Sequence, residues 1–330
     1  MFGIFLKESE FHKMKKWPKV SIVMAIYKPN KIWLMQQLES LNTQKYNGEI
    51  ELLVWNDSPE YKECQKILHQ YITNFPFRLL SDGQNHGATG AFARLTEAAS
   101  GKYIAYCDQD DIWLPEKIST AVAVMERDSS CVICHVGMKL IDADGKFFQK
   151  LSYPSTLEVI NKASYQQKNF ILRNFAFGCA MLVNAQFAKS VLPFPGNGVY
   201  HDQWLACCGA YGGRVIFLED KLLLHRIHNS NTSAVLQGIT TKEEYYQKKL
   251  LRDTELVRAL KKKFSYDVNE ILLDIAAWTN SRNEYSKTRS WNNIKGLLRG
   301  MSLRRDITIF ELLLPFIPQQ IFGIIITLCK

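Results

Sequence analysis

Apolar residues in the first part of the chain follow two spacings, one typical of buried strands and one typical of helices. Residues 19–27, KVSIVMAIY, form a nearly continuous apolar run rich in β-branched side chains, which predicts a buried parallel strand. Residues 31–41 carry apolar side chains at positions 34, 35, 38 and 41, a helical spacing. The alternation continues through predicted strands at 49–55, 77–80 and 103–107 and predicted helices at 61–75, 91–99 and 115–127. This order predicts an α/β fold with a doubly wound, mostly parallel open sheet.

The later sequence predicts further strands and then helices. Residues 131–141 form a strand-like run, and the turn at 142–145 after it predicts a hairpin. Asp142 and Asp144 lack the other ligands of a calcium-binding loop, so the hairpin is the better interpretation. Apolar runs predict three more strands, at 177–183, 215–218 and 222–224. Residues 197–204 open a helix, and helical periodicity returns over 243–263 and 267–280.

Composition limits the classes of protein and partner. The chain has 330 residues, 47% hydrophobic and 22% charged, which suits one large α/β domain with an appendage. We expect a basic and apolar segment at 1–17, a main domain over 18–235 and a helical, basic extension over 236–330. The net charge of +9 favours an anionic partner. A recognisable nucleic-acid-binding motif is missing, which argues against nucleic acid.

The cysteines and the two ends of the sequence bear on its location. The eight cysteines lack zinc or disulfide spacing, so reduced thiols in a cytosolic protein are expected. No secretory signal is recognisable. The apolar run at 321–329 is too short to cross a bilayer but long enough to enter its surface. Together with the basic helices before it, this run predicts peripheral attachment to the anionic inner face of the cell membrane, a packed helical extension, or a dimer contact.

Three carboxylates follow the predicted strand at 103–107, namely Asp108, Asp110 and Asp111. Carboxylates this close repel one another, so a partly buried cluster needs a cation or a proton between them. Oxygen ligands suit Mg²⁺ or Mn²⁺, which also bind the phosphate oxygens of a substrate. The alternative is a solvated turn, but the apolar residues on both sides argue against it. Pro115 is expected in the first turn of the next helix, and Trp113 is expected in the core.

Other polar segments follow the neighbouring strands. Tyr27, Asp57, the glycine-rich loop at 85–90 and the acidic cluster all fall at the carboxyl ends of predicted strands. Ligands of open α/β sheets bind outside the carboxyl ends of the strands. We therefore expect these four segments to line one crevice.

Taken in order, these segments resemble the inverting family 2 glycosyltransferases, which have a GT-A fold and use nucleotide sugars. The resemblance covers roughly residues 18–233. It rests on VSIVMAIYKPNKIWLMQQLESLNTQ, ELLVWNDS, NHGATGAFARL, GKYIAYCDQDDIWLPEKI, FGCAMLV, HDQWLA and HRIHNSNTS. DQDDIWLPEK together with HDQW is similar to the bacterial subgroup that builds cell-surface polysaccharides such as capsule, O-antigen and cell-wall polymers, including many rhamnosyltransferases.

The resemblance implies a role for each matching residue. Ala25 and Tyr27 would flank the nucleotide base, and Asp57 would bond the base or the ribose. Asn56 stands where the family often carries a second acid, which puts that contact in doubt. The other implied contacts to the nucleotide sugar come from Asn85, Gly87, Arg94, Asp108, Asp110, Asp111 and Arg226. Arg94 has an equally weighted alternative as a surface or structural residue. The implied metal ligands are Asp108, Asp110 and His228, with a hydrogen-bonded loop histidine as the alternative for His228.

Asp202 matches the catalytic base of the family. It would take the proton of the acceptor hydroxyl, and its alternative is a helix N-cap. Trp204, beside it, is expected in the core. The implied reaction moves a sugar from dTDP-rhamnose or a UDP-hexose to a growing, lipid-linked polysaccharide.

Two rival interpretations were weighed against this one. A nucleotidyltransferase would carry a glycine-rich basic loop where this chain has YKPNK. A catalytically inactive scaffold of the same fold would not need the acids that are intact here, Asp57, Asp108, Asp110 and Asp202.

Overall fold

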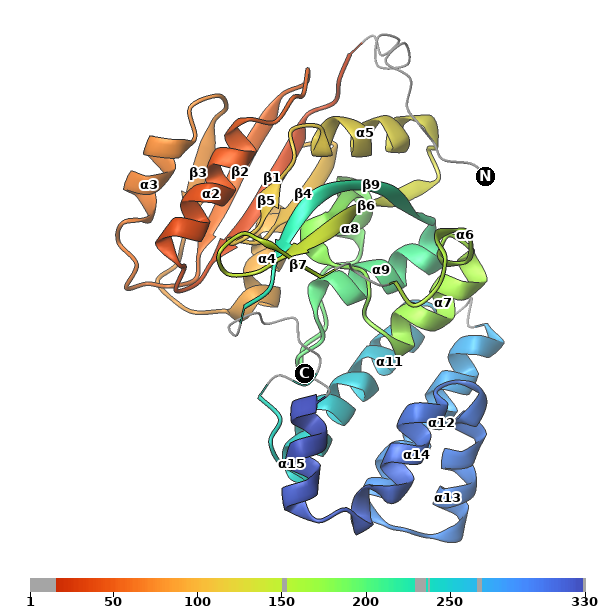
Figure 1. Cartoon of the computed structure of the whole chain (residues 1–330). Coiled ribbons are helices and arrows are strands. Elements are labelled where there is room, and N and C mark those ends of the chain that lie inside the picture. The colour runs from red at the N-terminus through yellow and green to blue at the C-terminus, as the bar shows by residue number, and fades with distance from the viewer. Residues whose placement is uncertain (1–15, 150–152, 229–235, 237, 266–268, 329–330) are drawn as a thin grey trace. The chain divides into compact units, whose positions relative to one another are not determined.

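The computed structural model describes the chain except residues 1–15, 150–152, 229–235, 237, 266–268 and 329–330 (Figure 1). The chain forms two compact units. The first comprises Met1–Ala163, Phe175–Phe194 and Cys208–Asn229, and the second comprises Ser164–Asn174, Pro195–Cys207 and Ser230–Lys330. Most of the predicted N-terminal segment, and the NSNTS part of the last resembling block, lie outside the described residues.

The first unit is built on a nine-stranded sheet ordered β3-β2-β1-β4-β8-β6-β9-β5, with β7 paired to β6. Strands β1 to β4 are parallel, β8 runs antiparallel to both β4 and β6, and β9 is parallel to β6. The strands are β1 Val20–Ile26, β2 Ile50–Asn56, β3 Phe77–Leu80, β4 Tyr103–Cys107, β5 Ile112–Trp113, β6 Cys131–Ile141, β7 Phe147–Gln149, β8 Met181–Asn184 and β9 Arg214–Arg226. The predicted α/β class with a mostly parallel sheet is confirmed.

Helices cover both faces of this sheet because side chains of its central strands alternate between two buried faces. On one face, alternate residues of β1 pack with α2 (Lys31–Asn42), α3 (Cys64–Tyr71) and α5 (Lys117–Arg127). On the other, Thr96 of α4 (Gly87–Ala98) lies 2.7 Å from the Tyr106 hydroxyl of β4. Helix α8 (Ala185–Ser190) contacts α4, and α6 spans Leu157–Ile160.

Several local predictions need correction. Helix α5 begins at Lys117, so Pro115 lies in the turn before it and not in its first turn. Strand β8 begins only at Met181, after a 3-10 turn at Gly178–Ala180. The strands predicted at 215–218 and 222–224 are one strand, β9, because register shifts against β6 absorb the polar residues between them. The predicted hairpin at 142–145 is confirmed by the antiparallel pairing of β6 with β7.

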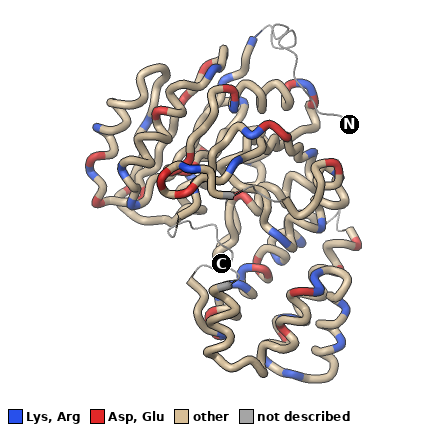
Figure 2. The backbone as a smooth tube through the Cα atoms, viewed as in Figure 1, with Lys and Arg blue, Asp and Glu red and all other residues tan. Residues whose placement is uncertain are grey.

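The second unit contains most of the helices after residue 240, as predicted. Asn269 caps α12 by accepting a hydrogen bond from the Leu272 amide at 3.0 Å. Lys and Arg recur along these helices (Figure 2). None of the helices in the described part of the chain is long and apolar enough to cross a membrane. The helices here are α7 Ala163–Leu172, α10 Lys242–Glu244, a π-helical turn Tyr245–Leu250, α11 Leu251–Lys263, α12 Glu270–Lys287, α13 Trp291–Leu298, α14 Arg305–Leu313 and α15 Gln319–Leu328. Helix α9, His201–Gly212, belongs to this unit as far as Cys207 and to the first unit from Cys208.

The described cysteines are buried and free, which agrees with the expected reduced thiols. Trp113 and Trp204 are 1% and 3% exposed, so both belong to the core as predicted.

Candidate active site

The first strand and the acidic cluster are joined by Gln109. The Tyr27 amide donates to Gln109 Oε1 at 2.9 Å, and Gln109 Nε2 donates back to the Tyr27 carbonyl at 3.0 Å. Tyr27 itself is 46% exposed, and Ala25, two residues earlier, is half-buried. This reciprocal pair fixes the loop of Asp108 and Asp110 against the carboxyl end of β1.

Asp57 joins the end of β2 to the glycine-rich loop. Its side chain is buried, and Oδ1 accepts a hydrogen bond from the His86 amide at 2.7 Å. Asn85 donates to the Asp57 carbonyl at 3.0 Å and accepts from the Gly87 amide at 3.2 Å. Gly87 has φ of +66°, a backbone conformation that favours glycine. The amide of Asp57 donates to the Ile26 carbonyl at 2.8 Å, so β1, β2 and this loop meet.

Arg94 of α4 contacts strand β2 and an earlier turn of its own helix. Its guanidinium lies 5.4 Å from the centre of the Trp55 ring, and Nη1 donates to the Gly90 carbonyl at 3.2 Å. The Trp55 ring also meets the edge of the His86 ring, with the centres 5.9 Å apart. These contacts are structural, and a role of Arg94 in holding a diphosphate stays a prediction.

His228, after the end of β9, meets the acidic cluster. Its Nε2 lies 2.9 Å from Asp110 Oδ2, and its ring lies against Trp33 with the centres 4.6 Å apart. The side chains of His228 and Asp110 are 9% and 15% exposed. The predicted hydrogen-bonded histidine and the predicted metal ligand are therefore both compatible with this position.

Arg226 holds the loop of residues 108–111 in place by hydrogen bonding to its backbone. It is 1% exposed, and Nε donates to the Asp110 carbonyl at 2.9 Å while Nη2 donates to Gln36 Oε1 at 2.7 Å. Nη1 donates to the carbonyls of Asp142 and Ala143 at 3.1 and 3.2 Å. Because these donors go to protein acceptors, contact of Arg226 with a diphosphate stays a prediction.

Asp111 is fully buried and paired with His225. His225 Nδ1 lies 2.9 Å from Asp111 Oδ1, which also accepts from the Arg226 amide at 2.9 Å. Burial opposes ionisation of Asp111, but the charge of His225 and these hydrogen bonds outweigh it and lower the pKa of the carboxyl. Burial likewise disfavours charged His225, yet the Asp111 charge raises the pKa of His225. Asp111 thus anchors the loop internally.

We call the polar groups at the carboxyl ends of these strands the rim: Tyr27, Asp57, residues 85–87, residues 108–111 and His228. Their hydrogen bonds confirm that the four predicted segments lie together. Residues 21–192 match the sequence model of a family described as Glycosyl transferase family 2.

The chain belongs to this family. Among its curated relatives are an uncharacterized protein of Mycobacterium tuberculosis, 25% identical over 63% of this chain, and an uncharacterized glycosyltransferase of Methanocaldococcus jannaschii, 24% identical over 64%. The matches cover 59% and 72% of those proteins. The chain therefore spans about three fifths of the length of the mycobacterial relative.

Solved structures of S. aureus TarS residues 1–349 share the fold. The complex with UDP-GlcNAc has a TM-score of 0.57 and 15% identity, covering 89% of this chain and 87% of TarS 1–349. The complex with UDP has a TM-score of 0.60 and also 15% identity, covering 89% of this chain and 86% of that one. The predicted GT-A fold of this family 2 chain is confirmed.

The 2.9 Å between Asp110 Oδ2 and His228 Nε2 suits a hydrogen bond and also two ligands of one divalent cation, so the metal role of this pair stays a prediction. Two ligands about 2.1 Å from Mg²⁺ at a right angle lie about 3 Å apart, close to the 2.9 Å seen here. Among the described residues, Asp111, Cys179 and His225 also lie close enough together to hold a metal ion. Burial raises the pKa of the Cys179 thiol well above its usual value, and a neutral thiol is a poor ligand for a hard cation. The rim pair is therefore the better match for Mg²⁺ or Mn²⁺.

Asp202 belongs to the second unit. It is the second residue of α9, which begins at His201, so it is not the N-cap of that helix. Its Oδ1 accepts hydrogen bonds from the Gln203 amide at 2.6 Å and from Asn174 Nδ2 at 3.2 Å. A carboxylate in the first turn of a helix interacts favourably with the helix dipole.

The sequence did not indicate three residues that shape these regions. Gln109 stands between Asp108 and Asp110, where the motif specifies no residue type. No sequence pattern indicated that Asn174 contacts Asp202. Lys117 is 3% exposed with its Nζ 3.3 Å from the centre of the Trp113 ring, and burial lowers its pKa to about 8. A lysine in the first turn of an amphipathic helix is expected at the surface, so nothing predicted this contact.

Proposed function

We propose that this chain is an inverting glycosyltransferase that moves a sugar from a nucleoside diphosphate to an acceptor hydroxyl. The observation that carries the proposal is the rim, where Gln109 and Asp57 tie the ends of β1 and β2 to the acidic cluster and the glycine-rich loop. Ligands of such sheets bind at this edge. Family membership supports the same reaction class.

In this proposal the rim binds the donor. Ala25, Tyr27 and Asp57 contact the nucleoside, while Asn85 and Gly87 keep the loop close to it. Asp108, Asp110 and His228 hold Mg²⁺ or Mn²⁺, which when bound neutralises charge on the departing diphosphate. Asp111 and Arg226 keep the acidic loop in place through their buried hydrogen bonds.

Asp202 is the proposed base. As the acceptor oxygen bonds to the anomeric carbon, Asp202 takes the hydroxyl proton, and the bond to the diphosphate breaks on the opposite face. Asn174, which donates to Asp202 Oδ1, orients the carboxylate. Asp202→Asn should lower turnover by about 100- to 10,000-fold while the dissociation constant of the donor stays unchanged. Unchanged turnover in this variant would eliminate the assignment.

The donor is proposed to be a UDP-hexose or dTDP-rhamnose. TarS, of the same fold, was crystallised with UDP-GlcNAc and with UDP, which supports a UDP-linked sugar. A screen of nucleotide sugars with Mn²⁺ by thermal shift identifies the donor, because a ligand that binds only the folded state raises the melting temperature. No stabilisation by any nucleotide sugar would contradict the proposal.

The acceptor is proposed to be lipid-linked, with the enzyme held at an anionic membrane surface. Helices α14 and α15 and the 3-10 turn between them, Leu314–Phe316, expose apolar side chains, including Leu313 at 53%, Phe316 at 78% and Ile324 at 61%. Flotation with anionic vesicles tests this. The double variant Leu313→Ser, Phe316→Ser should lower the partition coefficient at least about tenfold, whereas Leu273→Ser, at a residue 49% exposed on α12, should not. Equal flotation of all three proteins would remove the membrane proposal.

A further inference from the structure

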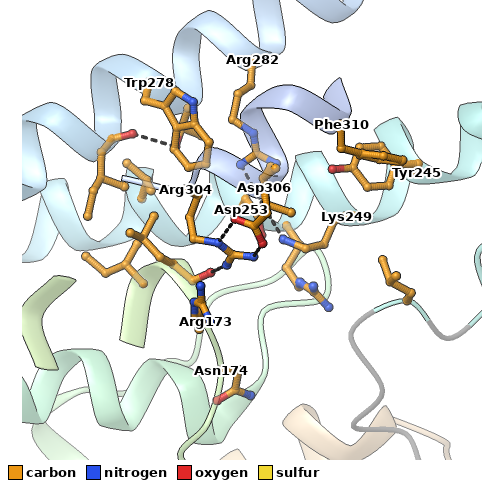
Figure 3. A pocket seen from close by; sticks show the side chains of 18 of the residues that line it. Arg173, Asn174, Tyr245, Lys249, Asp253, Trp278, Arg282, Arg304, Asp306 and Phe310 are labelled. Carbon is orange, nitrogen blue, oxygen red and sulfur yellow. Dashed lines mark hydrogen bonds and ion pairs between the residues drawn. The ribbon is translucent and has the colours of Figure 1, made fainter. Parts of the chain in front are cut away.

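The second unit encloses a cavity of about 450 Å³, a volume typical of small-molecule sites, which span roughly 300–1,000 Å³. Most of its wall is apolar, and Figure 3 shows Trp278, Tyr245 and Phe310 among the lining side chains. Helices α7, α11, α12, α14 and α15 all contribute to it. The shape and the apolar wall suit the aliphatic part of a ligand.

The charged side chains of this wall are mostly basic. Five basic residues line the described cavity, Arg173, Lys249, Arg252, Arg282 and Arg304, against two acids, Asp253 and Asp306. Arg304 and Asp306 form two hydrogen bonds of 2.8 and 2.7 Å, and Arg282 Nη1 lies 3.0 Å from Asp253 Oδ2 (Figure 3). Arg282 also donates to Glu311 Oε1, 2.7 Å from Nη2, so three acids offset three of the five positive charges, and the formal excess of two favours an anion.

Lys249 and Arg252 are, with Arg282, the most buried basic residues of this wall. Lys249 also pairs with Asp253, and burial lowers its pKa to about 8, an effect that Asp253 opposes and that Arg282 and Arg252 increase. Arg252 is 8% exposed, with its guanidinium 5.1 Å from the centre of the Tyr200 ring. An anion in the cavity would offset the repulsion among these cations.

The cavity also adjoins the proposed base within the same unit. Asn174 lines the cavity and donates to Asp202 Oδ1. Gln203, the next residue, lines it as well and donates to the Phe170 carbonyl at 2.9 Å. Helices α14 and α15 present Ile307, Phe310 and Ile325 to the cavity and other apolar residues to the surface. The same two helices therefore carry both the cavity wall and the proposed membrane face.

We propose that this cavity binds the phosphate and the adjoining aliphatic segment of a lipid-linked acceptor. The inference rests on the proposed function for the identity of the ligand as acceptor. A free anion would leave the apolar wall unused, and a neutral lipid would make no use of the basic side chains, so the phosphate ester of an aliphatic chain suits both parts of the cavity.

Calorimetric titration of the full chain with decyl phosphate, inorganic phosphate and decanol, at monomeric lipid concentrations, tests the proposal. Decyl phosphate should bind at least about tenfold more tightly than either half of the molecule, because a hydrogen-bonded charge and buried methylenes each contribute that much. Failure of decyl phosphate to bind would overturn the proposal. Equal binding of inorganic phosphate or of decanol would overturn it as well.

Matched variants locate the site. Arg173→Gln, at an exposed lining residue whose loss should not affect folding, and Arg252→Gln, at a buried one, should each weaken decyl phosphate binding about tenfold. Arg258→Gln, on the same helix α11 but 74% exposed and paired with Glu255, should leave it unchanged. Equal effects of all three, or none, would overturn the assignment to this cavity.

Failure here and failure of the proposed function give different results. Donor binding is read independently, by thermal shift with nucleotide sugars, and depends on the rim in the first unit. If a nucleotide sugar stabilises the chain but decyl phosphate does not bind, only the cavity proposal is refuted. A chain that binds decyl phosphate but no nucleotide sugar refutes the proposed function and keeps the cavity as an amphiphile site.

Discussion

The rim and the interior of the helical unit both gather acids and bases, but they hold them differently. At the rim, Asp110 keeps 15% of its side chain exposed and meets the imidazole of His228. In the second unit, Glu311 accepts hydrogen bonds of 2.7 to 3.1 Å from Arg282 and one of 2.7 Å from Tyr245, and the Arg282 and Glu311 side chains are 3% and 4% exposed. Asp110 and His228 can exchange their protein partner for a ligand, whereas a break in the Arg282–Glu311 pair leaves a buried charge.

The contrast between Asp110 and Glu311 shows that burial and the number of partners, more than the presence of charge, decide how much stability is lost when an acid is removed. Two opposite patterns of effect on stability and donor binding are therefore expected. Changes in the helical unit's network should cost stability and spare donor binding, and changes at the rim should do the reverse.

The largest effect is expected for Glu311→Gln. Loss of the carboxylate leaves buried Arg282 partly uncompensated, which should lower the free energy of unfolding by about 3–5 kcal/mol. Denaturant unfolding measures it. Glu284→Gln, with a side chain 57% exposed and paired with Lys287, is the control and should change stability by less than about 0.5 kcal/mol. The comparison breaks if the two variants are equally stable, or if Glu311→Gln folds normally but fails to bind the donor.

Asp110→Asn should show the opposite pattern. The neutral amide is a weaker ligand for a divalent cation, so the Mn²⁺-dependent affinity for the donor should fall by about 10- to 100-fold. Because Asp110 is only partly buried, the free energy of unfolding should change by less than about 1 kcal/mol. Calorimetric titration with and without Mn²⁺ measures the affinity. Asp144→Asn, an exposed acid of the neighbouring hairpin, should alter neither quantity. Normal donor affinity in Asp110→Asn would remove the metal site from the rim.

Arg226→Lys should affect both stability and donor binding, because Arg226 is buried and its hydrogen bonds hold the rim in place. Lysine keeps the charge but cannot reach the Asp110 carbonyl, Gln36 and the hairpin carbonyls together. We expect a loss of about 1–2 kcal/mol in stability and a decrease in donor affinity smaller than that of Asp110→Asn. A decrease as large as that of Asp110→Asn, with unchanged stability, would instead indicate direct contact between Arg226 and the donor.

Much of the fold and the position of the rim followed from local patterns. The apolar run before Asp57 and the one before Asp108 each predicted a strand, and the carboxyl ends of parallel strands meet at one edge. Contacts between distant polar residues did not follow. Asp253, Arg282 and Glu311 meet in three dimensions although each is 29 residues from the next, and no periodicity marks such a pair. Periodicity reports which face of an element is buried, but not which polar side chains meet there.

The smallest effect is expected for Glu51, which lies at the amino end of β2, the end opposite the rim. Glu51 is the second residue of β2, whereas Asp57 follows its last. Burial opposes ionisation of Glu51, but hydrogen bonds from Ser21, Ser100 and Lys19 outweigh it and lower its pKa to about 2. Because the pKa is lower in the folded chain than the ordinary value of 4.5, ionised Glu51 stabilises the fold above pH 4.5, and this contribution is lost as the pH falls towards 2.

Glu51→Gln should therefore lower the free energy of unfolding by about 1–2 kcal/mol at pH 7, and the difference from the unaltered chain should shrink as the pH is lowered from 5 to 3. Denaturant unfolding across this pH series measures it, with the exposed Glu39→Gln of α2 as the control. Donor affinity should not change, because Glu51 lies at the amino end of β2, away from the rim. A stability difference that stays constant with pH would mean that the carboxylate charge of Glu51 contributes nothing. A loss of donor affinity would show that acids at both ends of the strands serve the site, and the distinction drawn here by burial and partners would fail.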